Sequence, residues 1–115
     1  MFRRLASALL LALTLSMTSA ARGDALVVAS YYNQPGITAS GERFNPNVCT
    51  AAHKRVPFNT VIKFTNLKNN KSVNARVNDR FPQTKGRDYD LSIQCAKKLG
   101  FIKQGVIHLR AQIVK

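Results

Sequence analysis

Two stretches in which apolar and polar residues largely alternate constrain the fold of this chain most strongly. They span residues 60–66 and 72–78. A period of two residues is typical of a β-strand with one buried face. The connection between them has Asn69 and Asn70 at its centre, and asparagine tolerates the left-handed backbone that tight turns require. The sequence therefore predicts a β-hairpin. Its expected inward residues are Ile62, Phe64, Val73, Ala75 and Val77.

Other segments predict further short strands. Leu26–Tyr32 is apolar and aromatic, residues 51–53 fit a brief strand or a turn, and Val106–Val114 alternates. His108 falls on the outward face of that last segment. Its expected inward residues are Ile107, Leu109, Ala111 and Ile113.

One short helix is predicted between these strands. Ser92 fits the N-cap, where its hydroxyl would accept a bond from a free backbone amide of the first turn. Gly100 fits the residue just past the end. The apolar face consists of Ile93, Cys95, Ala96 and Leu99. Several short strands and one helix in 115 residues favour a closed β-barrel, which removes exposed strand edges.

The N-terminal residues 1–20 have the layout of a secretory signal peptide. Arg3 and Arg4 precede an apolar run and then small residues. The run is shorter than the roughly 20 residues that span a bilayer, which argues against the alternative of a membrane anchor. No cysteine follows it to carry a lipid. We expect a signal peptide at 1–20 and one barrel domain at 21–115, exported to the periplasm or secreted, without a membrane anchor.

The chain is strongly basic. Without Arg3 and Arg4, 16 of its 18 Lys and Arg residues remain against five Asp and Glu, a formal net charge of +11. Such a surface favours polyanions. For an exported protein, anionic cell-wall glycan or lipid headgroups fit better than nucleic acid, although the charge also fits a role in solubility alone.

Cys49 and Cys95 are the two cysteines of the chain. Export to an oxidising compartment makes a disulfide between them plausible, and two separate buried thiols are the alternative. Because no C-x-x-C spacing occurs, a zinc or redox motif has no support.

Three of the five acidic residues fall within the short segment Val77–Ser92: Asp79, Asp88 and Asp90. Continued alternation places Asp79 on the inward face at the barrel mouth, where a carboxyl is partly removed from water, beside Arg80. Asp79 is therefore either an acid for chemistry or a neutralised loop charge. Asp90 is either a site acid or a helix-capping charge. Asp88 is interpreted as a partner for Arg87 or a lysine.

Four further residues are candidates for a site. Glu42 is the only glutamate and stands beside Arg43, so it is a site acid or half of an exposed surface pair. His53 fits a general base, a substrate donor or a satisfied buried histidine. Alternation places one of Tyr31 and Tyr32 in the core and leaves the other to stack on a sugar ring.

Several short motifs follow one another along the chain: Ala29–Tyr32, Thr38–Asn45, Thr50–His53, Pro57–Phe58, Val77–Arg80, Pro82, Gly86–Arg87 and Asp90–Ser92. Together they resemble the rare lipoprotein A family over nearly all of residues 26–114. Tyr31 stands where the family usually has Trp, and Phe81 where it usually has Gly. Cys49 and Cys95 lie outside its usual pattern.

The resemblance implies a mainly β fold, a six-stranded double-psi β-barrel with one or two short helices, as in expansins. It also implies an endolytic lytic transglycosylase that needs no cofactor and acts as a monomer on peptide-poor peptidoglycan strands. The bond cleaved joins N-acetylmuramic acid (MurNAc) to N-acetylglucosamine (GlcNAc), and the products are 1,6-anhydro sugars. The family's functional acids fall on Glu42, Asp79 and Asp90. The residues expected to bind substrate are His53, Tyr32, Thr38 and Arg80.

Cleavage without water needs one well-placed acid with a raised pKa. It protonates the glycosidic oxygen and then accepts the proton of the muramyl 6-hydroxyl. We expect Asp79 in this role, Asp90 and Glu42 in positioning or tuning, and His53 with Glu42 on the opposite wall of one groove. The alternative is a non-catalytic, expansin-like module that binds or loosens cell-wall glycan. A role on nucleic acid is disfavoured because interleaved aromatic residues are few.

Overall fold

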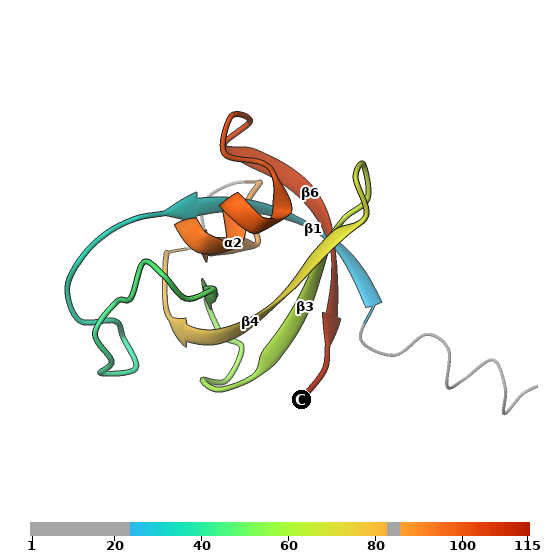
Figure 1. The fold of residues 1–115 in the computed structure, drawn as a ribbon. Helices are drawn as coiled ribbons and strands as arrows, with labels where there is room; N and C mark the ends of the chain where they lie inside the picture. The colour runs from blue at the N-terminus through green and yellow to red at the C-terminus, as the bar shows by residue number, and fades with distance from the viewer. Residues whose placement is uncertain (1–23, 83–85) are drawn as a thin grey trace, which may run out of the picture.

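The computed structural model describes residues 24–82 and 86–115 (Figure 1). The expected signal peptide at 1–20 lies outside these residues. Within the described part of the chain there are six strands and one helix. They are β1 (Asp24–Tyr32), β2 (Thr50–Ala52), β3 (Val61–Asn66), β4 (Lys71–Asp79), β5 (Tyr89–Ser92), α2 (Ile93–Leu99) and β6 (Val106–Ile113).

The strands close into a barrel in the order β1-β5-β2-β4-β3-β6. The pairs β1/β5 and β2/β4 are parallel, and the other four pairs are antiparallel. Because each strand pairs on both sides, the barrel has no open sheet edge. The predicted closed six-stranded barrel with a short helix is confirmed.

The core follows the predicted alternation. Phe64 of β3 and Val77 of β4 are fully buried, and Leu99 closes the core from α2. Ile113 pairs with the buried Ile62 and so lies on the predicted face, but it is 61% exposed. It is the last residue of β6, at an open end of the barrel where no further layer of side chains covers it.

The predicted turn between β3 and β4 is confirmed. Asn70 has a φ of 60°, the left-handed conformation that the sequence required. The asparagine side chains also make contacts that alternation does not predict. Asn66 and Asn69 both donate to the carbonyl of Leu99, at 2.8 and 3.1 Å, and so join the hairpin to the end of α2.

Ser92 occupies the N-cap of α2, but the predicted capping bond is wrong. Its fully buried hydroxyl accepts the amide of Thr50 and donates to the carbonyl of Val48, both at 2.9 Å. Ser92 is also the last residue of β5, and its hydroxyl bonds to the backbone at the start of β2 instead of to a backbone amide of the helix. The other end of α2 is as predicted, because Gly100 is left-handed (φ 79°) and donates to the carbonyl of Ala96.

A disulfide joins Cys49 to Cys95, with Cα atoms 4.8 Å apart. It connects the residue before β2 to the buried face of α2. Of the two expectations for these cysteines, the structure shows the bonded one.

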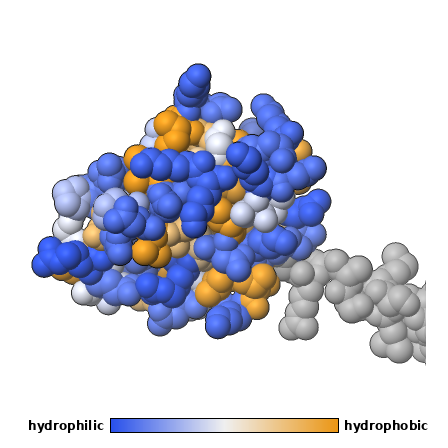
Figure 2. Space-filling view, in the orientation of Figure 1, coloured by the Kyte–Doolittle hydropathy of each residue, from blue (hydrophilic) through white to orange (hydrophobic). Residues whose placement is uncertain are grey.

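The long connection between β1 and β2 extends to one side of the barrel (left in Figure 1). It returns to the end of β4, where the amide of Ser40 donates to the carbonyl of Asn78 at 3.1 Å. Figure 2 shows a face that is mostly hydrophilic with separate apolar patches, in keeping with the high content of Lys and Arg. Within residues 24–82 and 86–115, no helix is long and apolar enough to span a membrane.

Candidate functional site

A bulge at Asn78 decides which way Asp79 faces. Ala51 pairs with Val77, but the next residue of β2, Ala52, pairs with Asp79, so Asn78 is an extra residue in β4. Paired residues on neighbouring strands share a face of the sheet. Val77 therefore faces the core with Ala51, whereas Asp79 faces the other side with Ala52. The predicted inward direction of Asp79 was wrong, because it assumed an uninterrupted alternation.

This register places two carboxyl groups on either side of one small residue. Ala52 pairs with Asp79 of β4 on one side and with Asp90 of β5 on the other. The methyl group of Ala52 leaves open the space between them. A pocket of about 200 Å³ forms there. We call it the acid pocket, and its lining includes Tyr32, Ala52, Asp79, Arg80, Phe81 and Asp90.

The Asp79 carboxylate is held by two backbone amides. Oδ1 accepts the N–H groups of Ala39 and Arg80, both at 2.9 Å. Among the described residues, none donates a hydrogen bond to Oδ2. The side chain is thus oriented through one oxygen while the other is available to a ligand in the acid pocket.

The side chain of Asp90 is partly buried. The hydroxyl of Ser30 donates to its Oδ1 at 2.9 Å. Burial raises the pKa of Asp90, the charge of Asp79 adds to the rise, and Ser30 and Arg87 oppose it. The side chain bonds to Ser30 on β1 and not to the first turn of α2, which speaks against the helix-capping interpretation.

Tyr32 lines the acid pocket and also a second pocket next to it. Its ring packs against Phe44 with centroids 5.4 Å apart. Its buried hydroxyl has no hydrogen-bond partner among the described residues. Burial raises the pKa of Tyr32 to about 12, the nearby Thr50 hydroxyl opposes the rise, and the charges of Asp79 and Asp90 add to it. Tyr31 instead packs on Phe101 against the core, so one of the two tyrosines contacts the core, as predicted. Stacking of Tyr32 on a sugar ring stays a prediction.

The second pocket has a volume of about 190 Å³ and is polar but uncharged apart from Asp79. We call it the neutral pocket, and its lining includes Tyr32, Gln34, Gly36, Thr38, Phe44 and Asp79. Because both pockets share Tyr32, Gln34 and Asp79, they adjoin each other, and we call the two together the groove. The Thr38 hydroxyl is used within its own loop, where it donates to the carbonyl of Glu42 at 3.0 Å.

Glu42 lies outside both pockets. Its carboxylate oxygens accept the two terminal nitrogens of Arg76, each at 2.8 Å, and Ser40 donates to it at 3.0 Å. Hydrogen bonds from Arg76 and then Ser40 lower the pKa of Glu42 to about 2. A carboxyl with that pKa is ionised at neutral pH and is poorly suited to donate a proton. Glu42 is half of a surface pair, but with Arg76 and not with its neighbour Arg43.

His53 opens into a third pocket. Its Nδ1 accepts the amides of Arg55 (2.9 Å) and Val56 (3.0 Å), so the neutral ring carries its proton on Nε2. Burial lowers the pKa of His53, and the charge of Arg80 lowers it further. The pocket has about 180 Å³. We call it the basic pocket, and its lining is His53, Lys54, Arg55, Phe81, Arg87 and Asp88.

The basic pocket adjoins the acid pocket through Phe81, which lines both. The sequence led us to expect His53 and Glu42 on one wall opposite Asp79. The structure does not show this arrangement, because His53 lines the basic pocket and Glu42 lies outside all three pockets. The bulge and the separate anchoring of Glu42 by Arg76 account for the difference.

Arg80 and Asp88 have partners that the sequence did not indicate. The guanidinium of Arg80 lies 4.0 Å from the centroid of the Phe58 ring. It donates hydrogen bonds to the backbone carbonyls of His53 and Asp79, each at 3.3 Å. It forms no ion pair with a described carboxylate. Asp88 accepts the amide of Val28 at 2.8 Å, so its expected pairing with Arg87 or a lysine is not found among the described residues.

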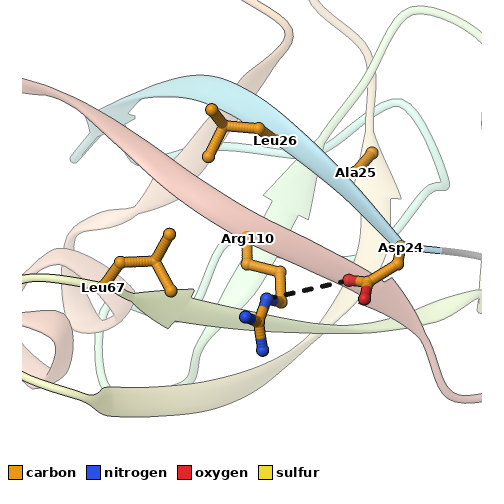
Figure 3. A pocket seen from close by; sticks show the side chains of 5 residues that line it. All are labelled: Asp24, Ala25, Leu26, Leu67 and Arg110. Carbon is orange, nitrogen blue, oxygen red and sulfur yellow. Dashed lines mark ion pairs between the residues drawn. The ribbon is translucent and has the colours of Figure 1, made fainter.

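The other end of β1 carries a pocket of about 240 Å³ without a pair of acids (Figure 3). Its carboxylate, Asp24, lies 3.8 Å from Arg110. Asp24 and Tyr32 are the two ends of the nine-residue strand β1, and eight steps along a strand span about 26 Å. We therefore place the candidate site at the acid pocket. His108 is exposed on β6, as predicted. Among the described residues, no three metal-ligating side chains gather at one point.

Solved structures with the same fold support this architecture. The Streptomyces papain inhibitor superposes with a TM-score of 0.67 at 18% identity, covering 80% of this chain and 94% of its own. An aspartate-to-asparagine mutant of Clavibacter michiganensis expansin, in complex with cellohexaose, gives a TM-score of 0.61 at 18% identity, covering 80% of this chain and 50% of its own. At this identity the likeness shows the double-psi barrel fold alone.

Sequence comparison identifies the family. A "Probable endolytic peptidoglycan transglycosylase RlpA" from Nostoc is 49% identical over 77 residues, 67% of this chain and 21% of its own length. The "Endolytic peptidoglycan transglycosylase RlpA" of Pasteurella multocida is 43% identical over 91 residues, 76% of this chain and 31% of its own. The chain thus spans about a fifth to a third of these relatives. The profile of the family described as lytic transglycolase matches residues 24–111, and the chain belongs to this family.

Proposed function

We propose that the chain is an endolytic peptidoglycan lytic transglycosylase. It would cleave the MurNAc–GlcNAc bond of peptide-poor glycan strands and leave 1,6-anhydro ends. The observation that carries the proposal is the pair Asp79 and Asp90, set on either side of Ala52 in one groove. Family membership supplies the reaction class, and the pair supplies groups able to perform it.

The surroundings of the two acids suggest how they divide the work. Asp90 has the raised pKa, so it holds a proton closer to neutral pH and suits protonation of the glycosidic oxygen. Asp79 is oriented by two amide donors and suits acceptance of the proton from the muramyl 6-hydroxyl. The bond from C1 to the leaving oxygen breaks as the bond from C1 to O6 forms. One proton leaves Asp90 and one reaches Asp79, so the reaction is balanced without water.

Other side chains of the groove would bind the strand. Tyr32, whose ring packs against Phe44, lines both pockets at their junction. Thr38 lines the neutral pocket and Arg80 the acid pocket. A substrate of this kind lies outside the cytoplasm, in agreement with the expected export signal and with a periplasmic or secreted protein. That the protein acts as a monomer stays a prediction.

The test is a digest of peptide-free glycan strands with the purified chain, analysed by mass spectrometry. Anhydro products are one water lighter than hydrolysis products, so the two reactions are resolved. We expect anhydro products from the wild type and none from Asp79→Asn or Asp90→Asn, with binding to glycan kept. Asp24→Asn, at the far end of β1, is the matched control and should remain active.

Two outcomes would contradict the proposal. Hydrolysis products in place of anhydro products would change the reaction class. No product at all, with retained binding to insoluble wall material, would indicate the expansin-like, non-catalytic module instead.

A further inference from the structure

The basic pocket lies next to the two acids but takes no part in the reaction described above. Phe81 belongs to both the basic pocket and the acid pocket. Arg87 is near enough to Asp90 for its charge to lower the pKa of that carboxyl. A strand bound across the acid pocket would therefore extend past the basic pocket.

Two cations of the basic pocket have no ion-pair partner among the described residues. Arg55 and Arg87 are exposed and form no ion pair with a described carboxylate. Asp88 is the one carboxylate in the lining, and its Oδ2 accepts the amide of Val28 at 2.8 Å. Arg80, by contrast, stacks on the ring of Phe58 and donates hydrogen bonds to two backbone carbonyls. The pocket thus presents two guanidinium groups, of Arg55 and Arg87, that are in no ion pair with a described carboxylate.

His53 adds a directed neutral donor. Because backbone amides occupy Nδ1, its N–H is on Nε2. Its ring is packed on Tyr89, with centroids 4.6 Å apart, which limits its movement. An anion in the pocket would therefore meet both charge and a fixed hydrogen-bond donor.

We propose that the basic pocket is a subsite for a carboxylate carried by the glycan strand. Arg55, Arg87 and His53 would bind this carboxylate. The inference rests on the proposed function. In peptidoglycan the group of this chemistry is the free lactyl carboxylate of a muramyl unit. Guanidinium groups bind a carboxylate through paired hydrogen bonds.

The chemistry of the pocket explains why such a subsite favours strands without peptides. A volume of about 180 Å³ corresponds to roughly six water molecules, which is enough space for a lactyl group. A peptide in amide linkage removes the negative charge of the lactyl carboxylate. The pocket would thus recognise a bare strand by the charge at this position.

The test measures binding in the inactive Asp79→Asn background, with three glycans of matched length. They are peptide-free strands, the same strands with their carboxylates converted to methylamides, and oligomers of N-acetylglucosamine. We expect the peptide-free strands to bind at least tenfold more tightly than the other two. In Arg55→Ala with Arg87→Ala, this difference should disappear. Because the variant could disturb the fold, Arg55→Gln with Arg87→Gln and a circular dichroism spectrum accompany it.

A control pair removes the same charge elsewhere. Lys63 on β3 and Lys98 on α2 are exposed and lie outside the basic pocket. Lys63→Ala with Lys98→Ala should keep the tenfold preference. An equal loss in this control would overturn the subsite, because net charge alone would then explain the binding.

The result is separable from the proposed reaction. A wild type that prefers carboxylated strands but forms no anhydro product retains the subsite and refutes the reaction. A wild type that cleaves, and whose inactive variant binds free and amidated strands equally, retains the reaction and refutes the subsite.

Discussion

Arg76 holds both carboxylate oxygens of Glu42 at 2.8 Å, across 34 positions of sequence. Arg76 also donates to Asn59 at 3.1 Å. The pair ties the loop after β1 to β4, three residues before Asp79. The same loop supplies the amide of Ala39 that orients the Asp79 carboxylate. Glu42 is thus connected to the candidate site through backbone position and not through contact with the acid pocket.

Exchange of the two charges tests this connection. Glu42→Gln should lower the rate of anhydro product formation about ten- to hundredfold, because a small displacement of a reacting group has effects of this size. The melting temperature should change little, since the pair is exposed. Glu42→Arg combined with Arg76→Glu should restore much of the rate. Failure of this double variant, in a folded protein that still binds glycan, would mean that Glu42 acts on substrate directly.

Asp90→Asn should stabilise the protein at neutral pH. Burial raises the pKa of Asp90 in the folded state, so the folded protein binds the proton more tightly than the unfolded chain. Stability is therefore lost as pH rises from the unfolded to the folded pKa, and the loss is complete above the folded pKa. Asparagine avoids this loss and still accepts the Ser30 bond. Urea titrations should show a stability gain at pH 7 that disappears below about pH 3. A variant equally destabilised at both pH values would contradict the assignment.

Loss of the Cys49–Cys95 disulfide should lower the free energy of unfolding by about 4 kcal/mol, from the chain entropy of a loop with a sequence separation of 46. Urea unfolding of the wild type with and without dithiothreitol measures the difference. Cys49→Ala with Cys95→Ala is the control and should not respond to the reductant. Alkylation of two thiols in native, unreduced protein would show that the bond is absent.

Substitutions at Ser92 test whether its side chain acts as a helix cap or as a buried link between strands. Ser92→Ala should cost about 1–3 kcal/mol, because the amide of Thr50 and the carbonyl of Val48 lose their partner. Ser92→Asp should cost more, since it buries a carboxylate beside a carbonyl oxygen. A helix cap would predict the reverse order, because aspartate caps as well as serine. Thermal unfolding of the two variants decides between the two roles.

Much of the barrel follows from local sequence. Phe64 and Val77 are buried because each belongs to an alternating run, and burial of apolar area drives that pattern directly. Asn70 and Gly100 adopt positive φ, as their places in a turn and after a helix predicted. These features depend on neighbours in sequence, so they can be predicted without the tertiary structure.

The candidate site follows from the sequence less directly. The family motifs singled out Asp79 and Asp90, and the structure places both in one pocket. The bulge at Asn78 has no marker in the local sequence, so the direction of Asp79 was predicted wrongly. The partner of Glu42 was also missed, because Arg76 becomes its neighbour only when the loop after β1 folds back on β4.

The sequence by itself determined that this chain forms a small barrel and which residues fill it, because alternating hydrophobicity is a local property that burial selects. The tertiary structure decided what the acids can do. Asp90 receives its raised pKa from burial among strands that are distant in sequence, and Asp79 receives its direction from a register shift between β2 and β4. Both effects depend on how strands meet, and strand register is a property of the closed barrel as a whole.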